Sequence, residues 1–373
     1  MPDSFFSAWR TCHGFNIFLL NFVETNYIID GLSYPDSPNR SYPVGNGLIT
    51  LPDGNVVNAL IRTVTAKRNT TMWFKNVRVY TLDTGFKYST EELDKLLAPQ
   101  KYTPCSGQDM VRFGWVSPLG QDEEVLCHKI NDDYFFRCRT EKRMLPASVV
   151  NEELKEKVEE LELKQARNVS KKEKAELKEN IVNELLPRAF RLHKENWIWV
   201  SGKYGYVVVN VASDKQAEDL IALLRKSLGS LPARLFKFNK SVNDCMTEWV
   251  ANGEGPVGIE IGDEVELKAV DGAGGTIKAK KQDLDTAEIK AHLEAGKVVT
   301  SLAITVNDDV SLVIDDSFAL KRIKLSDTVI DENATVSDDP AAQLDADLTL
   351  ISGEFSKLIP VLVDAFGGES EAE

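Results

Sequence analysis

The segment IKAKKQDLDTAEIKAHLEAGKVVT, residues 277–300, predicts a strand, a helix and a second strand in quick succession. Side chains alternate between the two faces of a strand, so Lys278 and Lys280 would share one face. Ile277 and Ala279 would point the other way. A lysine-bearing strand in a protein with a formal net charge of -14 needs a function or a counter-charge.

The helix of this segment is expected to begin at Asp283 or Asp285. Asp285 and Glu288 stand at the spacing of a capping box, and Gly296 is typical of the residue that follows a helix end. The chain would then enter the second strand. Five polar side chains are thereby expected at one edge of a sheet: Lys278, Lys280, Lys281, Gln282 and Lys297.

The negative charge is concentrated at the C-terminal end. Residues 325–373 contain twelve Asp or Glu and one Lys, which leaves the preceding part nearly balanced. An uneven field of this kind is compatible with nucleic-acid binding, although each basic group taken singly is more typical of a solvated surface. Lysines with few exposed aromatic residues favour contact with duplex phosphates over base stacking. The other basic groups are Arg137, Arg139, Lys142 and Arg143; Arg225 and Lys226; and Lys321, Arg322 and Lys324.

Strands and helices alternate without a regular repeat, which predicts an α+β fold of mixed sheets with flanking helices. Residues 1–71 are interpreted as an N-terminal extension outside the fold, with a genuine additional domain as the alternative. Four regions are expected from Met72 onward. They are a sheet region (72–147), a helical hairpin (148–190), a second sheet region with the lysines (191–324) and an acidic segment (325–373).

Two helical elements are predicted in more detail. Within the hairpin, Ser170 and Glu173 stand at capping-box spacing and begin the second helix. The last helix of the chain is expected near residues 354–366.

The chain lacks the familiar catalytic patterns for phosphate-binding loops, dinucleotide binding, zinc proteases and serine hydrolases. Its five cysteines are scattered with no C-x-x-C pair, which is typical of a reducing cytosol and predicts no metal and no cofactor. Adjacent acidic residues such as Asp315 and Asp316 would point to opposite faces of a strand and clamp a metal poorly. No apolar run reaches the ~20 residues of a membrane span. A non-enzymatic protein is favoured, with a metal-dependent nuclease as an alternative.

Several motifs occur in the order and context of one known family: MWFKN, TPCSGQDM, LPRAF, ALLRKSLGSLP, TEWV, AKKQDL, EAGKVVT, LKR and DAD. From Met72 to its C-terminal end, the chain resembles the bacterial RdgC family of recombination-associated proteins. The first 71 residues have no counterpart in the family's usual pattern.

The resemblance implies a ring-shaped homodimer, in the cytoplasm and nucleoid, that encircles double-stranded DNA without sequence preference. Such a protein limits RecA-dependent recombination and is linked to replication-fork repair. Lys281 and Gln282 of AKKQDL would line the central hole, whereas Lys278, Lys280 and Lys297 join them on spacing alone. A direct inhibitor of the recombinase, with DNA binding incidental, is the competing hypothesis.

The resemblance also assigns two residues to the dimer interface. Phe190 of LPRAF would sit where two tips meet, and Arg167 of KQAR would brace that contact. The alternative for Phe190 is a core residue that follows a helix.

Overall fold

The computed structural model describes the backbone of four strands within the first 71 residues and then residues 74–83, 85–120, 124–270, 274–332 and 339–370. The chain divides into two compact units, Met1–Thr71 and Met72–Glu373. The first unit contains an antiparallel sheet in the order β1-β2-β4-β3, and the interpretation of this unit as an extension stays a prediction. Its strands are β1 (Phe18–Phe22), β2 (Thr25–Ile29), β3 (Val44–Thr50) and β4 (Val56–Thr63).

The second unit is built on a 12-stranded sheet whose described strand pairs are all antiparallel. The main path, in spatial order, is β13 (Ile277–Lys280), β12 (Ile259–Ala269), β14 (Lys297–Val306), β15 (Val310–Asp315), β16 (Ala319–Leu325), β5 (Val77–Leu82), β10 (Tyr206–Val209), β9 (Phe190–Ser201), β8 (Asp133–Met144) and β6 (Val111–Val116). Two short strands join it at the side: β11 (Ala233–Leu235) pairs with β5, and β7 (Cys127–Ile130) pairs with β8. The predicted α+β class is confirmed. Because β5 lies between β16 and β10, strands from before and after the helical hairpin belong to one sheet.

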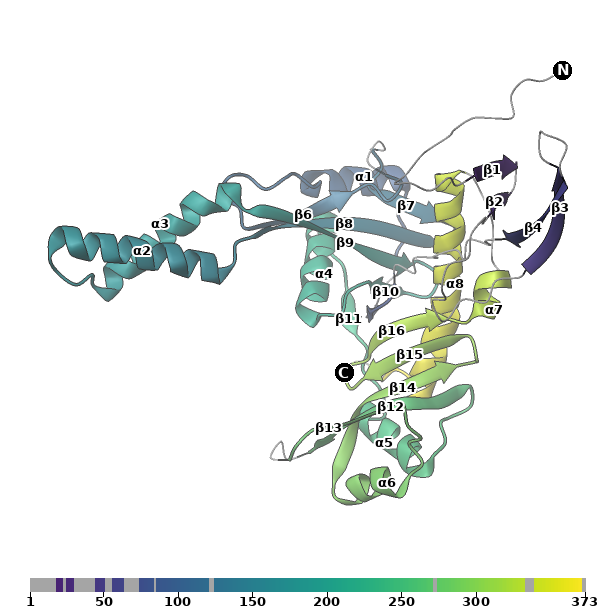
Figure 1. Ribbon diagram of the computed structural model, residues 1–373. Coiled ribbons are helices and arrows are strands. Elements are labelled where there is room, and N and C mark those ends of the chain that lie inside the picture. Colours follow the sequence, from purple (N-terminus) through teal and green to yellow (C-terminus); the bar gives the residue numbers. More distant parts are fainter. Residues whose placement is uncertain are drawn as a thin grey trace. The chain divides into compact units, whose positions relative to one another are not determined.

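Two hydrophobic cores cover the two faces of the central strands. Alternation along β9 sends Trp199 into one core and Val200 into the other, and β5 divides Val79 and Tyr80 in the same way. One core contains buried residues of the long helix α8 (Pro340–Ala365), and Figure 1 shows α8 running across the direction of the strands. The remaining helices of the two cores are α5 (Val242–Asn252) and α6 (Ala287–Glu294) on the α8 side, and α1 (Thr90–Leu97) and α4 (Asp214–Leu228) on the other.

Helix α8 begins at Pro340, well before the predicted start near residue 354. Asp339 caps it by accepting the N–H of Ala341, and Pro340 occupies the first turn, where its missing N–H is not needed. The helix presents an apolar stripe at helical spacing. The predicted acidic segment, residues 325–373, therefore contributes side chains to the core. The buried members of the stripe are Leu348, Ile351, Phe355, Leu358, Ile359 and Leu362.

The predicted helical hairpin is confirmed as α2 (Ala147–Gln165) and α3 (Lys171–Leu185), inserted between β8 and β9. Figure 1 shows it extending beyond the ends of these two strands. The capping box of Ser170 and Glu173 is present, and Val158 and Ile181 are buried in the hairpin. The hairpin is therefore an extension of the β8–β9 ladder.

The segment after β13 differs from its prediction at the start of the helix. Thr286, not Asp285, caps α6, because its hydroxyl accepts the N–H of Ile289. Asp285 is engaged elsewhere, since its backbone N–H donates to Asp283 and its carboxylate pairs with Lys290. Gly296 follows the helix with a φ of 82°, as expected.

Candidate nucleic-acid interface

Strand β13 forms one end of the strand order and carries the predicted alternation. The side chains of Lys278 and Lys280 are each 60% exposed, while Ala279 is buried against the core. This part of the prediction is confirmed. The two lysines point to the face of the sheet that the core does not cover.

Two glutamates of β12 lie directly opposite these lysines. The antiparallel register pairs Glu266 with Lys278 and Glu264 with Lys280, and opposite residues of such a pair share a face. Lys278 Nζ lies 2.8 Å from Glu266 Oε2, and Lys280 Nζ lies 3.7 Å from Glu264 Oε2. Lys268 also contacts Glu266, at 3.0 Å. The exposed lysines of β13 thus lie beside carboxylates of β12.

Arg322 of β16 reaches the same group of charges from the other side. It lies in a register irregularity between β15 and β16, with a φ of 52°, and its N–H donates to Asn76 Oδ1. Its guanidinium binds both carboxylate oxygens of Glu264, at 2.9 and 2.6 Å. Strands β14 and β15 separate β12 from β16 in the sheet, so this bidentate pair spans the face between them.

We call this surface the charged face. It consists of the outward side chains Glu264, Glu266, Lys268, Lys278, Lys280, Lys321, Arg322 and Lys324. Hydrogen bonds from Arg322 hold the pKa of Glu264 below its ordinary value, and those from Lys278 do the same for Glu266. Both carboxylates are therefore ionised at neutral pH. Lys321 pairs with Asp315, at 2.5 Å.

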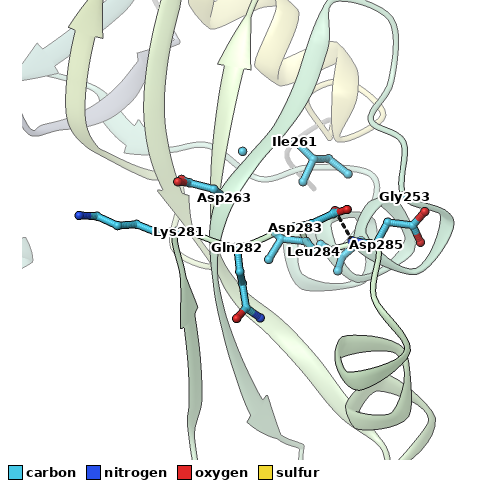
Figure 2. Close-up of a pocket in the computed structure, with 10 residues that line it drawn as sticks. Gly253, Ile261, Asp263, Lys281, Gln282, Asp283, Leu284 and Asp285 are labelled. Carbon is cyan, nitrogen blue, oxygen red and sulfur yellow. Dashed lines mark hydrogen bonds between the residues drawn. The ribbon is translucent and has the colours of Figure 1, made fainter.

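Lys281 and Gln282 lie in the turn that follows β13, and both are exposed. Lys281 has a φ of 56°, which breaks the alternation of the strand. The two residues border a cavity of about 610 Å³ whose walls also include Asp263, Asp283 and Asp285. Figure 2 shows Lys281 pointing away from Asp283 and Asp285. The Asp263 side chain points to the same side as Lys281 in this view.

Lys297 does not join the other four polar residues. It begins β14 opposite Ala269, on the same side of the ladder as the buried pair Leu267 and Val299. Its ammonium group donates to the carbonyl of Gly275 at 2.9 Å. The spacing argument fails here because β12 inserts between β13 and β14, and it could not say which face β14 would turn outward.

The three arginines of β8 are engaged within the protein. Arg137 and Arg139 share Glu195 of β9, and Arg143 is only 2% exposed. The guanidinium of Arg143 donates to the carbonyls of Leu186 and Ser106, which ties the base of the hairpin to a neighbouring loop. Arg137 and Arg139 are only 23% and 20% exposed, whereas Lys278 and Lys280 are each 60% exposed, so the charged face is a stronger candidate for phosphate contact.

Phe190 is 85% exposed at the start of β9, where it pairs with Met144. Alternation and register place further exposed apolar side chains on the same side of β6, β8 and β9. We call this surface the apolar face: Val111, Phe113, Met144, Phe190 and Leu192. Closer to the core the same side carries the buried Trp115 and Cys138, so the apolar face continues a core surface past its covering helices.

Arg167 lies in the turn of the hairpin and binds within its own chain. Its guanidinium donates to both carboxylate oxygens of Glu173, at 3.0 and 2.5 Å, and holds the pKa of Glu173 at about 2. Glu173 is also the capping-box residue of α3. In the protomer, Arg167 thus braces the hairpin turn.

The described residues include neither a metal-binding cluster nor a membrane-spanning helix. No group of three or more His, Cys, Asp or Glu in that part of the chain is placed to hold a metal ion. No described helix is long and apolar enough to cross a membrane.

Comparison with known proteins bears on the whole second unit. The family model described as "Putative exonuclease, RdgC" matches residues 72–369. The chain belongs to the RdgC family. The predicted resemblance is confirmed, and the match begins at the residue where the second compact unit begins.

Relatives within the RdgC family align over nearly their entire length. The recombination-associated protein RdgC of Proteus mirabilis is 45% identical over 301 residues, which cover 80% of this chain and 100% of that protein. The protein of the same name from Tolumonas auensis is 42% identical over 299 residues, covering 80% and 99%. The names of these RdgC relatives refer to recombination, whereas the description of the family model refers to an exonuclease.

The residues that sequence reasoning missed are the carboxylates of the charged face. The segment EVELK of β12 alternates Glu264, Glu266 and Lys268 on one face, a pattern readable in the sequence. It does not reveal that β12 pairs with β13, and so it could not show that these glutamates face the lysines.

Proposed function

We propose that the protein binds double-stranded DNA without sequence preference and thereby limits RecA-dependent recombination in the bacterial nucleoid and cytoplasm. The observation that carries this proposal is the charged face, where exposed cations of three strands stand on one open side of a sheet. Lysine and arginine side chains in such an array suit contact with successive phosphates, which supplies affinity without reading bases. The names of the RdgC relatives support the link to recombination.

We further propose that the protein acts as a ring-shaped homodimer that closes around the duplex. The apolar face supports this proposal, because exposed apolar side chains gathered on one surface are typical of association sites. In a two-fold assembly, two copies of the charged face would surround the DNA, one from each protomer. Phe190, the most exposed member of the apolar face, is assigned to the contact between protomers.

The direct test is binding of the full chain to a random-sequence duplex over a salt series, followed by fluorescence anisotropy. The variant Lys280→Ala/Lys281→Ala/Gln282→Ala removes two cations, and the slope of log K against log salt should become shallower by about 2, at ~0.9 per phosphate contact. The control, Lys155→Ala/Lys172→Ala, removes two exposed hairpin lysines and should leave the slope unchanged. A wild-type affinity that does not respond to salt would sink the proposal.

Two alternatives are outcomes of related measurements. If inhibition of recombinase-driven strand exchange persists when most DNA is uncovered, the protein acts by binding the recombinase directly. If duplex DNA is degraded in the presence of magnesium or manganese, the exonuclease description of the family model applies to this chain. DNA that stays intact while strand exchange falls with DNA coverage supports the proposed function.

A further inference from the structure

Glu264 and Glu266 occupy the middle of the charged face. Their side chains are each 21% exposed, and between them they contact four cations: Lys268, Lys278, Lys280 and Arg322. A surface evolved only for phosphate affinity would not require carboxylates there, since like charges repel an approaching phosphate. Their position therefore needs an explanation of its own.

The geometry gives the two carboxylates two effects. They hold four long side chains in place, because each carboxylate accepts from partners on β12 itself, on β13 or on β16. They also occupy the same N–H groups that a phosphate would bind. Ion pairs on an exposed surface are weak, so a phosphate can compete for these donors without first breaking a buried network.

We propose that Glu264 and Glu266 attenuate DNA binding: they are built-in competitors of the phosphates, and they set the duplex affinity below the level that the cations alone would give. This inference rests on the proposed function and adds a regulatory feature to the same surface. When DNA binds, each of these cations exchanges a carboxylate for a phosphate. The net gain in binding free energy is therefore smaller than it would be for an unpaired cation. The attenuation persists at neutral pH, where both carboxylates are ionised.

The discriminating variant is Glu264→Gln/Glu266→Gln, studied in the full chain with the salt series described above. Glutamine keeps the size and one acceptor oxygen of each side chain but removes the competing charge. The matched control is Glu159→Gln/Glu176→Gln, which makes the same change of net charge at two lysine-paired glutamates of the hairpin. Thermal unfolding establishes that both variants are folded, and the single variant Glu266→Gln serves if the double variant is not.

The expected result is a duplex affinity about 3- to 10-fold higher than that of the wild type at the same salt concentration, because the weak surface ion pairs of both carboxylates are lost. The slope of log K against log salt should steepen by about 1 to 2, because released cations neutralise further phosphates. Unchanged or weaker binding in a folded variant would overturn the inference and leave the proposed function intact. A wild-type protein that does not bind duplex DNA would overturn both.

Discussion

Phe190→Ala separates a role in assembly from a role in protomer folding. Since Phe190 is 85% exposed in the protomer, its truncation should change the free energy of unfolding by no more than ~0.5 kcal/mol. An aromatic anchor buried between subunits typically costs about 2 kcal/mol or more when it is truncated. A two-fold contact loses the ring from both protomers, so the total loss approaches ~4 kcal/mol, or nearly three decades in the dimer dissociation constant.

Sedimentation over a concentration series measures the dimer dissociation constant, and dissociation from closed circular DNA measures ring closure. We expect Phe190→Ala to weaken the dimer by at least 30-fold, the lower bound for about 2 kcal/mol, and to leave closed circles faster. The control is Val257→Ala, which truncates a fully exposed side chain in the loop before β12. An unchanged dimer and unchanged retention in Phe190→Ala would refute the assignment of Phe190 to the interface.

Two further predictions concern the protomer. Removal of Arg167 by Arg167→Ala should move the pKa of Glu173 upward from about 2 toward its ordinary value of 4.5, which a side-chain NMR titration measures. Because the folded pKa is the lower one, the stabilisation by this pair is present above the ordinary value and is lost as pH falls toward 2; a Glu173 pKa that stays near 2 in the variant would contradict the pairing. Phe355→Ala should lower the free energy of unfolding by about 3–5 kcal/mol, because it removes a fully buried ring of α8 that contacts Phe74 and Trp199. Gly353→Ala in the same helix faces open space and should raise that free energy by about 0.5–1 kcal/mol, so equal effects of the two changes in denaturant unfolding would contradict the burial of α8.

Local elements were predictable where one short pattern determines them. The capping box at Ser170 and the alternation in β13 depend only on neighbouring residues, and the structure confirms both. The start of α8 was missed because Asp339 and Pro340 resemble a loop in composition, although they form a typical N-terminus. In this case the apolar stripe after residue 348 was the stronger signal.

The candidate site was predictable only in part, since its geometry depends on strand order. Lys278 and Lys280 were placed correctly on a common face, whereas Lys297 was grouped with them without knowledge that β12 intervenes. The sequence places Arg322 in a different basic group, with Lys321 and Lys324, far along the chain from Glu264. The pair forms across β14 and β15, at the register irregularity of β16, and neither the strand order nor the irregularity can be read from the sequence.

The carboxylates of the charged face also bear on how an acidic protein could hold DNA. With Glu264 and Glu266 sharing four cations and Asp315 pairing with Lys321, the face has only a modest excess of positive charge. Few phosphates would be neutralised, so binding to linear DNA should be weak and should exchange rapidly at physiological salt. In the proposed ring this requirement would not apply, because topology and not contact strength would retain the duplex. Weak attraction inside a ring would let the protein move along DNA while it remains bound, which strong and unattenuated lysine contacts would prevent.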